Sequence, residues 1–166
     1  MKVQVKNTQT GNLVAAEIKA AGLADMPLKK DGWQFNWREL GKKSGATFFK
    51  LTLENSAQKV EGMLMLTLQD GGMLYMDCLE VAPKNYGSKG QLDFVAGCLL
   101  TYACKLSKEI GKPPSDGYLS FESKNVLIEM YQKKYGATWA MGQRMFFSPA
   151  AGIKLMELFL QSSEND

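Results

Sequence analysis

Residues 72–107 read GMLYMDCLEVAPKNYGSKGQLDFVAGCLLTYACKLS. The stretch begins as an apolar, strand-like run, passes at Ala82-Pro83 into a loop rich in Gly, Lys and Asn, and continues as an almost wholly apolar helix. A strand that leads through such a loop to a helix N-terminus presents free backbone N–H groups and the positive end of a helix dipole, which together suit a phosphate. The stretch therefore predicts an anion site at the junction of loop and helix.

The chain before this stretch has the pattern of antiparallel strands. Residues 3–18 contain two alternating runs around the turn Thr10-Gly11-Asn12 and predict an opening hairpin. Residues 46–54, 59–69 and 73–81 read as three further strands joined by short turns, which predicts an antiparallel meander. Gly62 lies inside the second of these strands, where a glycine marks a bulge or the close approach of another backbone.

Residues 22–43 have no regular pattern and carry three aromatic residues at alternate positions, Trp33, Phe35 and Trp37. Two roles are possible for these side chains. They attach a loop to the core, or they form one wall of a substrate cleft. The first reading is favoured, because aromatic side chains are mainly a source of buried apolar area.

The chain after the quoted helix alternates strands and helices. The pattern predicts, in order, a helix over 94–110, a strand over 117–122, a helix over 124–135 with Ser123 as N-cap, a strand over 139–147, and a C-terminal helix that starts at Ser148-Pro149. The inward residues of the last helix are expected to be Ile153, Met156, Phe159 and Leu160. The fold class is therefore α+β, with a mainly antiparallel central sheet flanked by helices.

The bulk composition is that of an ordinary globular domain. The 166 residues are 45% apolar and 22% charged, enough for one domain with a proper core. The net charge of +3 is too weak to predict a nucleic-acid partner. The N-terminus resembles no secretory signal, and no apolar run approaches the roughly 20 residues of a membrane span, so a cytoplasmic protein with no membrane partner is expected.

The cysteine and histidine counts limit the chemistry. Cys78, Cys98 and Cys104 lie in apolar elements without metal-ligand spacing and read as small buried hydrophobes, so no metal site is expected. The sequence contains no histidine, which excludes a histidine general base and any Ser-His or Cys-His triad. Acid–base chemistry must then use carboxylates, tyrosines, lysines or water.

The element order and two motifs resemble the GNAT superfamily of acetyl-CoA-dependent N-acetyltransferases. The strand end Leu79-Glu80-Val81-Ala82-Pro83 resembles the family's apolar-x-Val-x-Pro pattern, and Leu99-Leu100 resembles the leucine pair of its helix. Counting back from this pair places Gln91 and Ala96 at the ends of the Gln/Arg-x-x-Gly-x-Gly/Ala pyrophosphate motif and Phe94 at its middle glycine. The loop is a few residues longer than usual. The sequence thus resembles variant members with an extended pyrophosphate loop.

A second motif of the family is an Asn and a Gly separated by ten residues, with a tyrosine in the helix between them. Asn125 and Gly136 have this spacing, and Tyr131 lies one residue earlier than the general-acid tyrosine of many members. One residue on a helix corresponds to a rotation of about 100°. The resemblance implies one GNAT-like domain over residues 1–166, with N-terminal strands and an acceptor-side loop in 1–58, the acetyl-CoA-binding core in 59–147, and a helix and tail in 148–166.

The resemblance implies acetyl-CoA as co-substrate. Its pantetheine would pair with the backbone of Leu79 and Val81, and its pyrophosphate would lie along residues 91–97, beginning at Gln91. Asn125 is a further candidate cofactor-binding residue. The pyrophosphate would take the N–H groups of Phe94, Val95, Ala96 and Gly97. Lys84, Lys89 and Lys124 are alternatives for the 3′-phosphate, although each reads equally as a surface lysine.

The resemblance also implies direct attack of a primary amine in a ternary complex. Glu80 is the candidate base, with a solvent-facing edge carboxylate as the other reading, and Glu61 is the second choice. Tyr131 is the candidate acid, with a core aromatic as the other reading. The backbone N–H of Val81 would stabilise the oxyanion. The acceptor would be a small-molecule or protein amine, and the apolar C-terminal helix allows a homodimer.

Two alternatives remain beside the acetyltransferase. One is a catalytically weak or inactive GNAT-like module that binds CoA or a protein partner, which Phe94 and the displaced Tyr131 favour. The other is an unrelated α+β protein whose glycines only make turns. The agreement of two separate motifs in spacing and order favours the acetyltransferase.

Overall fold

The computed structural model describes residues 1–160, and the polar tail predicted for 161–166 lies outside them. The strands are β1 (Lys2–Asn7), β2 (Leu13–Ala20), β3 (Ala46–Leu53), β4 (Ser56–Leu68), β5 (Leu74–Val81), β6 (Leu92–Asp93), β7 (Leu119–Glu122), β8 (Thr138–Met141) and β9 (Arg144–Phe147). The helices are α1 (Trp37–Leu40), α2 (Val95–Ile110), α3 (Ile128–Tyr135) and α4 (Pro149–Leu160). Short 3-10 turns are η1 (Leu23–Asp25), η2 (Lys29–Asp31), η3 (Pro83–Asn85) and η4 (Asn125–Leu127).

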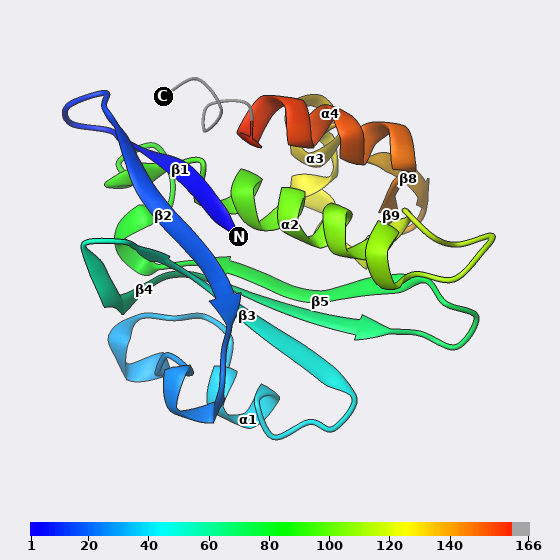
Figure 1. Cartoon of the computed structure of the whole chain (residues 1–166), viewed down its shortest axis with the longest axis horizontal. Coiled ribbons are helices and arrows are strands. Elements are labelled where there is room, and N and C mark those ends of the chain that lie inside the picture. Colours follow the sequence, from blue (N-terminus) through cyan, green and yellow to red (C-terminus); the bar gives the residue numbers. More distant parts are fainter. Residues whose placement is uncertain (161–166) are drawn as a thin grey trace.

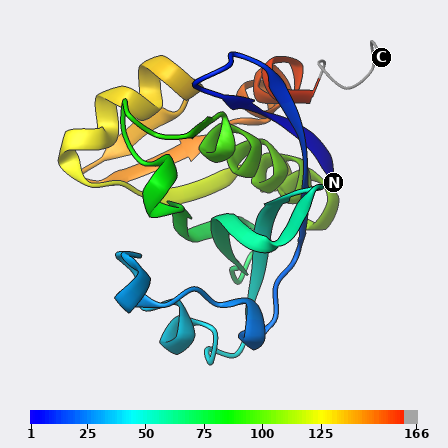
Figure 2. The same ribbon diagram turned by 90° about the vertical axis from the view of Figure 1, so that its left-hand side faces the viewer.

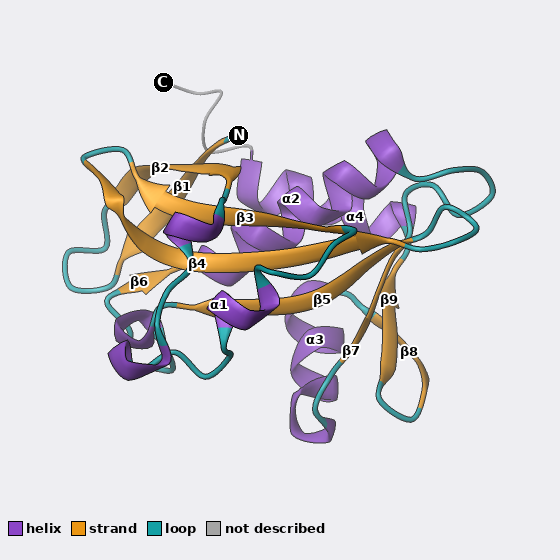
Figure 3. Cartoon of the chain, turned by 90° about the horizontal axis from the view of Figure 1, so that it is seen from below, coloured by secondary structure: helices purple, strands orange, loops and turns teal. Residues whose placement is uncertain are grey.

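The described strands form one sheet in the order β6-β1-β2-β3-β4-β5-β7-β9-β8 (Figure 3). Strands β1 to β5 pair antiparallel in sequence order, as the opening hairpin and the meander predict. The parallel pair is β5 with β7, which the crossover helix α2 joins. The predicted mainly antiparallel α+β fold is therefore confirmed.

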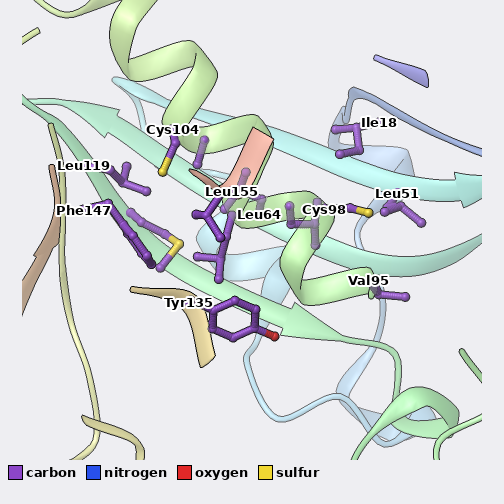
Figure 4. Packing of buried hydrophobic residues seen from close by; sticks show 14 of the residues in the cluster. Ile18, Leu51, Leu64, Val95, Cys98, Cys104, Leu119, Tyr135, Phe147 and Leu155 are labelled. Atoms are coloured by element: carbon purple, nitrogen blue, oxygen red, sulfur yellow. The ribbon is translucent and has the colours of Figure 1, made fainter. Parts of the chain in front are cut away.

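Two layers cover the sheet on opposite faces (Figures 1 and 2). Helices α2 and α4 pack on one face, over a core that includes Leu64, Cys98 and Phe147 (Figure 4). The segment with η1, η2 and α1 packs on the other face, where Trp33 and Trp37 are buried against Met63, Met65 and their neighbours. Both tryptophans thus attach this segment to the sheet, as the favoured reading of the aromatic residues predicts.

Glycines allow close contacts between α2 and its neighbours. A Cβ at Gly62 would lie 2.7 Å from Val95 Cγ1 and 2.8 Å from Leu99 Cδ1, so this glycine lets α2 approach β4. The register also shifts here, from Leu51 opposite Gly62 to Thr52 opposite Val60. The register shift confirms the predicted bulge, whereas the close approach at Gly62 is made by side chains of α2 and not by another backbone.

Three local predictions in the last third of the chain are wrong. Ser123 does not cap a helix, because its Oγ donates to the Lys124 carbonyl and a 3-10 turn follows. The strand predicted over 139–147 is a hairpin, because the chain reverses at Gly142, whose φ is +56°. Ile153 is 47% exposed, and Leu155 takes the inward position instead. Ser148 caps α4 as predicted, since its Oγ accepts from the N–H of Ala151.

Cys98 and Cys104 lie in the apolar core, as expected, whereas Cys78 is only half-buried. Burial raises the pKa of the Cys98 and Cys104 thiols to about 12, and that of the half-buried Cys78 to about 11. Such thiols stay protonated at neutral pH and are poor nucleophiles. In the described part of the chain, no helix is long and apolar enough to cross a bilayer.

Candidate functional site

The candidate site begins where β5 and β7 separate. The two strands pair in parallel only from Leu74 opposite Leu119 to Met76 opposite Phe121. Strand β5 then bulges at Asp77, because Met76 and Cys78 face consecutive residues of β4, and continues to Val81. Strand β7 ends one residue after its last pair with β5. Among the described strands, none therefore pairs with this edge of the last five residues of β5.

The unpaired edge presents backbone groups of Leu79 and Val81. The N–H of Ala82 donates to the carbonyl of Glu61 on β4, at 2.8 Å. Since the hydrogen-bonding direction alternates along a strand, the backbone groups of Val81 and Leu79 point away from β4. These N–H and C=O groups are directed at the gap, where an extended ligand with amide groups can pair with them as an added strand.

A cleft of about 390 Å³ occupies the gap. Its floor is β5 from Met76 to Val81. The other walls include Ala96 in the first turn of α2, Tyr131 on α3, Phe35 in the segment before α1, and residues of the segments that follow β5 and β7. This volume is within the range of small-molecule sites, about 300–1,000 Å³.

The N-terminus of α2 offers three backbone donors. The first bond of the helix joins the N–H of Cys98 to the Phe94 carbonyl, at 2.9 Å. The N–H groups of Val95, Ala96 and Gly97 therefore have no acceptor inside the helix, and the side chain of Phe94 does not cap them. Together with the helix dipole, these groups favour a bound anion.

Phe94 has the backbone conformation of a glycine. Its φ is +74°, the one positive φ at a non-glycine residue within 1–160. Its ring packs edge-on against Phe159 of α4, with centroids 5.8 Å apart. The side chain is thus directed to the core, and the family motif that expects a glycine here describes a real backbone requirement.

The lack of a side chain at Gly97 allows α4 to pack against α2. A Cβ at this position would lie 2.2 Å from Cζ of Phe159. The space beside Gly97 is therefore filled by α4, and it does not provide room for a pyrophosphate. A Cβ at Gly152 of α4 would lie 3.2 Å from Cβ of Cys104, so glycines on both helices allow α2 and α4 to pack closely.

The loop between β5 and α2 is held by the buried carboxylate of Glu61. This residue is 1% exposed and accepts from Nζ of Lys84 and from Nδ2 of Asn85, each at 2.8 Å. Oδ1 of Asn85 in turn accepts from the N–H of Leu92. Glu61, the second choice for the general base, does not line the cleft. Its hydrogen bonds show that it holds the loop in place. Lys84 is engaged by the same network.

Replacing Lys84 tests the network. Lys84→Met leaves the buried Glu61 carboxylate with one partner fewer, and a lost hydrogen bond to a charged group costs about 1.5–3 kcal/mol. We expect the free energy of unfolding to fall by about 1.5 kcal/mol in urea titrations. Lys89→Met, on the same loop with an exposed side chain, is the control and should change stability by less than about 0.5 kcal/mol. Equal losses in the two variants would contradict the role given to Glu61.

Glu80 lies in the cleft but its carboxylate is already engaged. Oε2 accepts from the N–H of Gln34 at 2.6 Å, and Oε1 accepts from the N–H of Phe35 at 3.1 Å and from Nε1 of Trp37 at 2.9 Å. The role of Glu80 as general base stays a prediction. The geometry adds a contact between β5 and the segment before α1 that the sequence did not suggest.

Tyr131 lies in the cleft on α3. Its ring packs against Phe121, with centroids 4.9 Å apart, and within residues 1–160 its hydroxyl makes no hydrogen bond. Burial raises the pKa of the hydroxyl to about 12, so the group keeps its proton at neutral pH. The arrangement allows Tyr131 to donate a proton into the cleft. Its role as general acid stays a prediction.

The cleft gathers half of the residues predicted for the site. Leu79, Glu80, Val81, Ala96 and Tyr131 line it. Five others do not line it: Gln91, Phe94, Val95, Gly97 and Asn125. Lys124, one of the three lysines predicted for the 3′-phosphate, also lines the cleft. Sequence reasoning missed Met130 and Gln34, which line it too. Of these, only Gln34 could have been expected from the sequence, because it lies between the aromatic residues that were considered as a wall of a substrate cleft.

Comparison with known proteins supports the fold. No protein-family model and no curated protein matches the sequence. Among solved structures, AtaTR bound with acetyl-CoA is similar with a TM-score of 0.64 and 14% identity, over 85% of this chain and 98% of that one. A KacTA–DNA complex gives 0.62 and 10%, over 86% and 98%. A candidate acetyltransferase from Exiguobacterium sp. 255-15 gives 0.54 and 14%, over 84% and 97%.

The chain therefore has a GNAT-like acyl-CoA N-acyltransferase fold, as its motifs predicted. These identities are low, and the similarity establishes the fold. Two of the similar structures are complexes that contain DNA. The comparison thus gives no support to the expectation that nucleic acid is not a partner, which rests on the net charge alone.

Proposed function

We propose that the protein is an N-acetyltransferase that moves the acetyl group of acetyl-CoA to a primary amine. The observation that carries the proposal is the unpaired edge of β5, which meets the uncapped N-terminus of α2 at one cleft. An extended chain with amides followed by a pyrophosphate fits these two features in this order. The fold of the similar structures, one of which contains acetyl-CoA, agrees with this.

The donor half of the site would hold acetyl-CoA. The backbone groups of Leu79 and Val81 pair with the pantetheine amides, and the N–H groups of Val95, Ala96 and Gly97 bind the pyrophosphate. Gln91 and Asn125 were also predicted to bind the cofactor, but both are exposed and lie outside the cleft lining. For the 3′-phosphate, Lys124 at the cleft replaces Lys84, whose ammonium group is paired with Glu61.

Acetyl-CoA supplies an acetyl group activated as a thioester. The N–H of Val81 donates to the acetyl carbonyl oxygen and stabilises the negative charge that develops there. Tyr131 holds a proton for the departing sulfur, and the acceptor amine loses its proton to water. Proton transfers of this kind contribute about 10²–10⁴ in rate. The described residues contain no cluster that could hold a metal ion, and the proposal uses none.

Acetyl-CoA binding is the direct test. We expect calorimetry to detect binding and the melting temperature to rise with occupancy, because saturation at 100 times the dissociation constant adds about 2.7 kcal/mol to stability. Ala96→Glu places a carboxylate beside the proposed pyrophosphate and should weaken binding at least about tenfold. Ala57→Glu, at an exposed position of β4, is the control. No thermal shift of the unmodified protein in millimolar acetyl-CoA would contradict the proposal.

A catalytically weak CoA-binding or protein-interaction module is the second candidate. The engagement of Glu80 by three N–H donors favours it, since a base with few free lone pairs is a weaker one. This candidate predicts acetyl-CoA binding without transfer to any of a panel of primary amines. The nature of the acceptor, small molecule or protein, and a homodimer remain predictions.

A further inference from the structure

One carboxylate on β5 holds the segment that covers the acceptor side of the cleft. The three donors to Glu80 come from Gln34, Phe35 and Trp37, more than forty positions earlier in the chain. Two of them are backbone N–H groups of a loop with no regular structure. Hydrogen bonds to a charged acceptor are roughly twice as strong as neutral ones, which suits them to hold such a loop.

The rest of the loop is attached away from the cleft. Trp33 and Trp37 are buried in the core below the sheet, and Lys50 of β3 binds Asp25 at 2.6 Å. Between the two tryptophans, the side chains of Gln34 and Phe35 are exposed and line the cleft. Glu80 is thus the contact that brings this exposed part of the loop onto β5. The ring of Phe35 stands edge-on to that of Trp37, with centroids 6.0 Å apart.

We propose that Glu80 is a positioning residue, whose carboxylate holds residues 32–37 as the wall of the acceptor half of the cleft. In this role Phe35 is the apolar surface that the substituent of the acceptor amine contacts. The assignment of this half to an acceptor rests on the proposed function. The assignment of Glu80 to the loop rests on the hydrogen bonds alone.

The chemistry of the contact explains why a carboxylate is needed. Both oxygens of Glu80 face N–H donors, Oε2 toward Gln34 and Oε1 toward Phe35 and Trp37. A glutamine has one acceptor oxygen and a donor NH₂ group. In Glu80→Gln the NH₂ group therefore meets at least one N–H donor, and the loop must release it.

The test compares three variants, Glu80→Gln, Trp37→Phe and Glu39→Gln. Trp37→Phe removes one donor and leaves the Glu80 carboxylate in place. Glu39→Gln changes an exposed carboxylate of α1 and is the control. The measurements are amide hydrogen exchange at Gln34 and Phe35, the acetyl-CoA dissociation constant, and the release of CoA thiol from acetyl-CoA with water as acceptor across pH.

We expect Glu80→Gln to accelerate exchange at Gln34 and Phe35 by about tenfold or more, and Trp37→Phe to accelerate it less. Acetyl-CoA affinity should stay within about threefold, because the donor half is built from β5 and α2. Thiol release to water should persist in Glu80→Gln, with the pH profile of the unmodified protein. Glu39→Gln should change none of these quantities.

Two results would overturn the proposal. The first is unchanged exchange at Gln34 and Phe35 in Glu80→Gln. The second is a loss of thiol release of about 100-fold or more in Glu80→Gln, with an altered pH profile and full release in Trp37→Phe, which is the behaviour of a general base. Failure of every variant and of the unmodified protein to bind acetyl-CoA would instead refute the acetyltransferase, and the exchange data would still decide what holds the loop.

Discussion

Gly90→Ala is expected to lower the free energy of unfolding by about 3 kcal/mol or more. A Cβ at this position would lie 2.4 Å from the carbonyl oxygen of Asn85 and 2.6 Å from its carbonyl carbon. Both are backbone atoms, so no side chain can rotate away to relieve the contact. Overpacking of this kind costs about 1–3 kcal/mol where side chains yield, and more where the backbone must move.

The loop around Gly90 has little freedom to adjust. Its carbonyl accepts from Oγ1 of Thr8 at 2.7 Å, and the N–H of Gln91 donates to the carbonyl of Lys84 at 2.9 Å. Asn85 is itself bound to the buried Glu61. A shift at Gly90 therefore breaks contacts to the turn after β1 and to β4 at once. Because the same loop leads into α2, acetyl-CoA affinity should fall together with stability.

Gly87→Ala is the matched control in the same loop. A Cβ there meets no atom within 4 Å, and the cost is the strain of alanine at a φ of +72°, about 1–2 kcal/mol. Urea unfolding and acetyl-CoA titration of both variants provide the comparison. Equal losses at the two glycines, or a larger loss at Gly87, would show that the contact with Asn85 does not hold this loop.

The fold could be read from the sequence because its signals are local. Alternating apolar residues predicted β1 to β5, and the apolar run after residue 94 predicted α2, since each strand or helix shows its own period. The hairpin of β8 and β9 was read as one strand, because Gly142 lies in a short segment where a turn and a bulge look alike. Ile153 was misplaced for a similar reason: α4 is apolar on more than one face.

The candidate site was predicted only in part, because its remaining contacts join distant parts of the chain. The strand end at Leu79 and Val81 could be recognised from a motif. The partners of Glu80 at Gln34 and Trp37 could not, since no pattern in the sequence pairs a carboxylate with donors so far away. The glycines show the same limit. Gly87, Gly90 and Gly97 look alike in sequence, yet one faces open space, one a backbone and one an aromatic ring.

Gly97→Val is expected to lower the free energy of unfolding by about 3 kcal/mol, through a clash with α4. The added Cβ would lie 2.2 Å from Cζ and 2.4 Å from Cε1 of Phe159. That ring also contacts Phe94 and Tyr135, with centroids 5.8 Å and 6.4 Å away, which limits the directions in which it can move. Thermal and urea unfolding measure the loss. The sequence alone would assign any loss of acetyl-CoA binding in this variant to the phosphate site.

A double variant separates the two explanations. Phe159→Ala removes the ring that the introduced valine side chain would meet, so Gly97→Val should cost less in the Phe159→Ala background than in the unmodified protein, by about 1–3 kcal/mol of coupling. Acetyl-CoA affinity, measured on the folded fraction, should be restored in the double variant to within about threefold of Phe159→Ala alone. Additive stability losses together with a persistent loss of affinity would mean instead that Gly97 is needed by the bound pyrophosphate. In that case the ligand would reach Gly97 itself, although the packing of α4 against this residue indicates that the open part of α2 ends at Ala96.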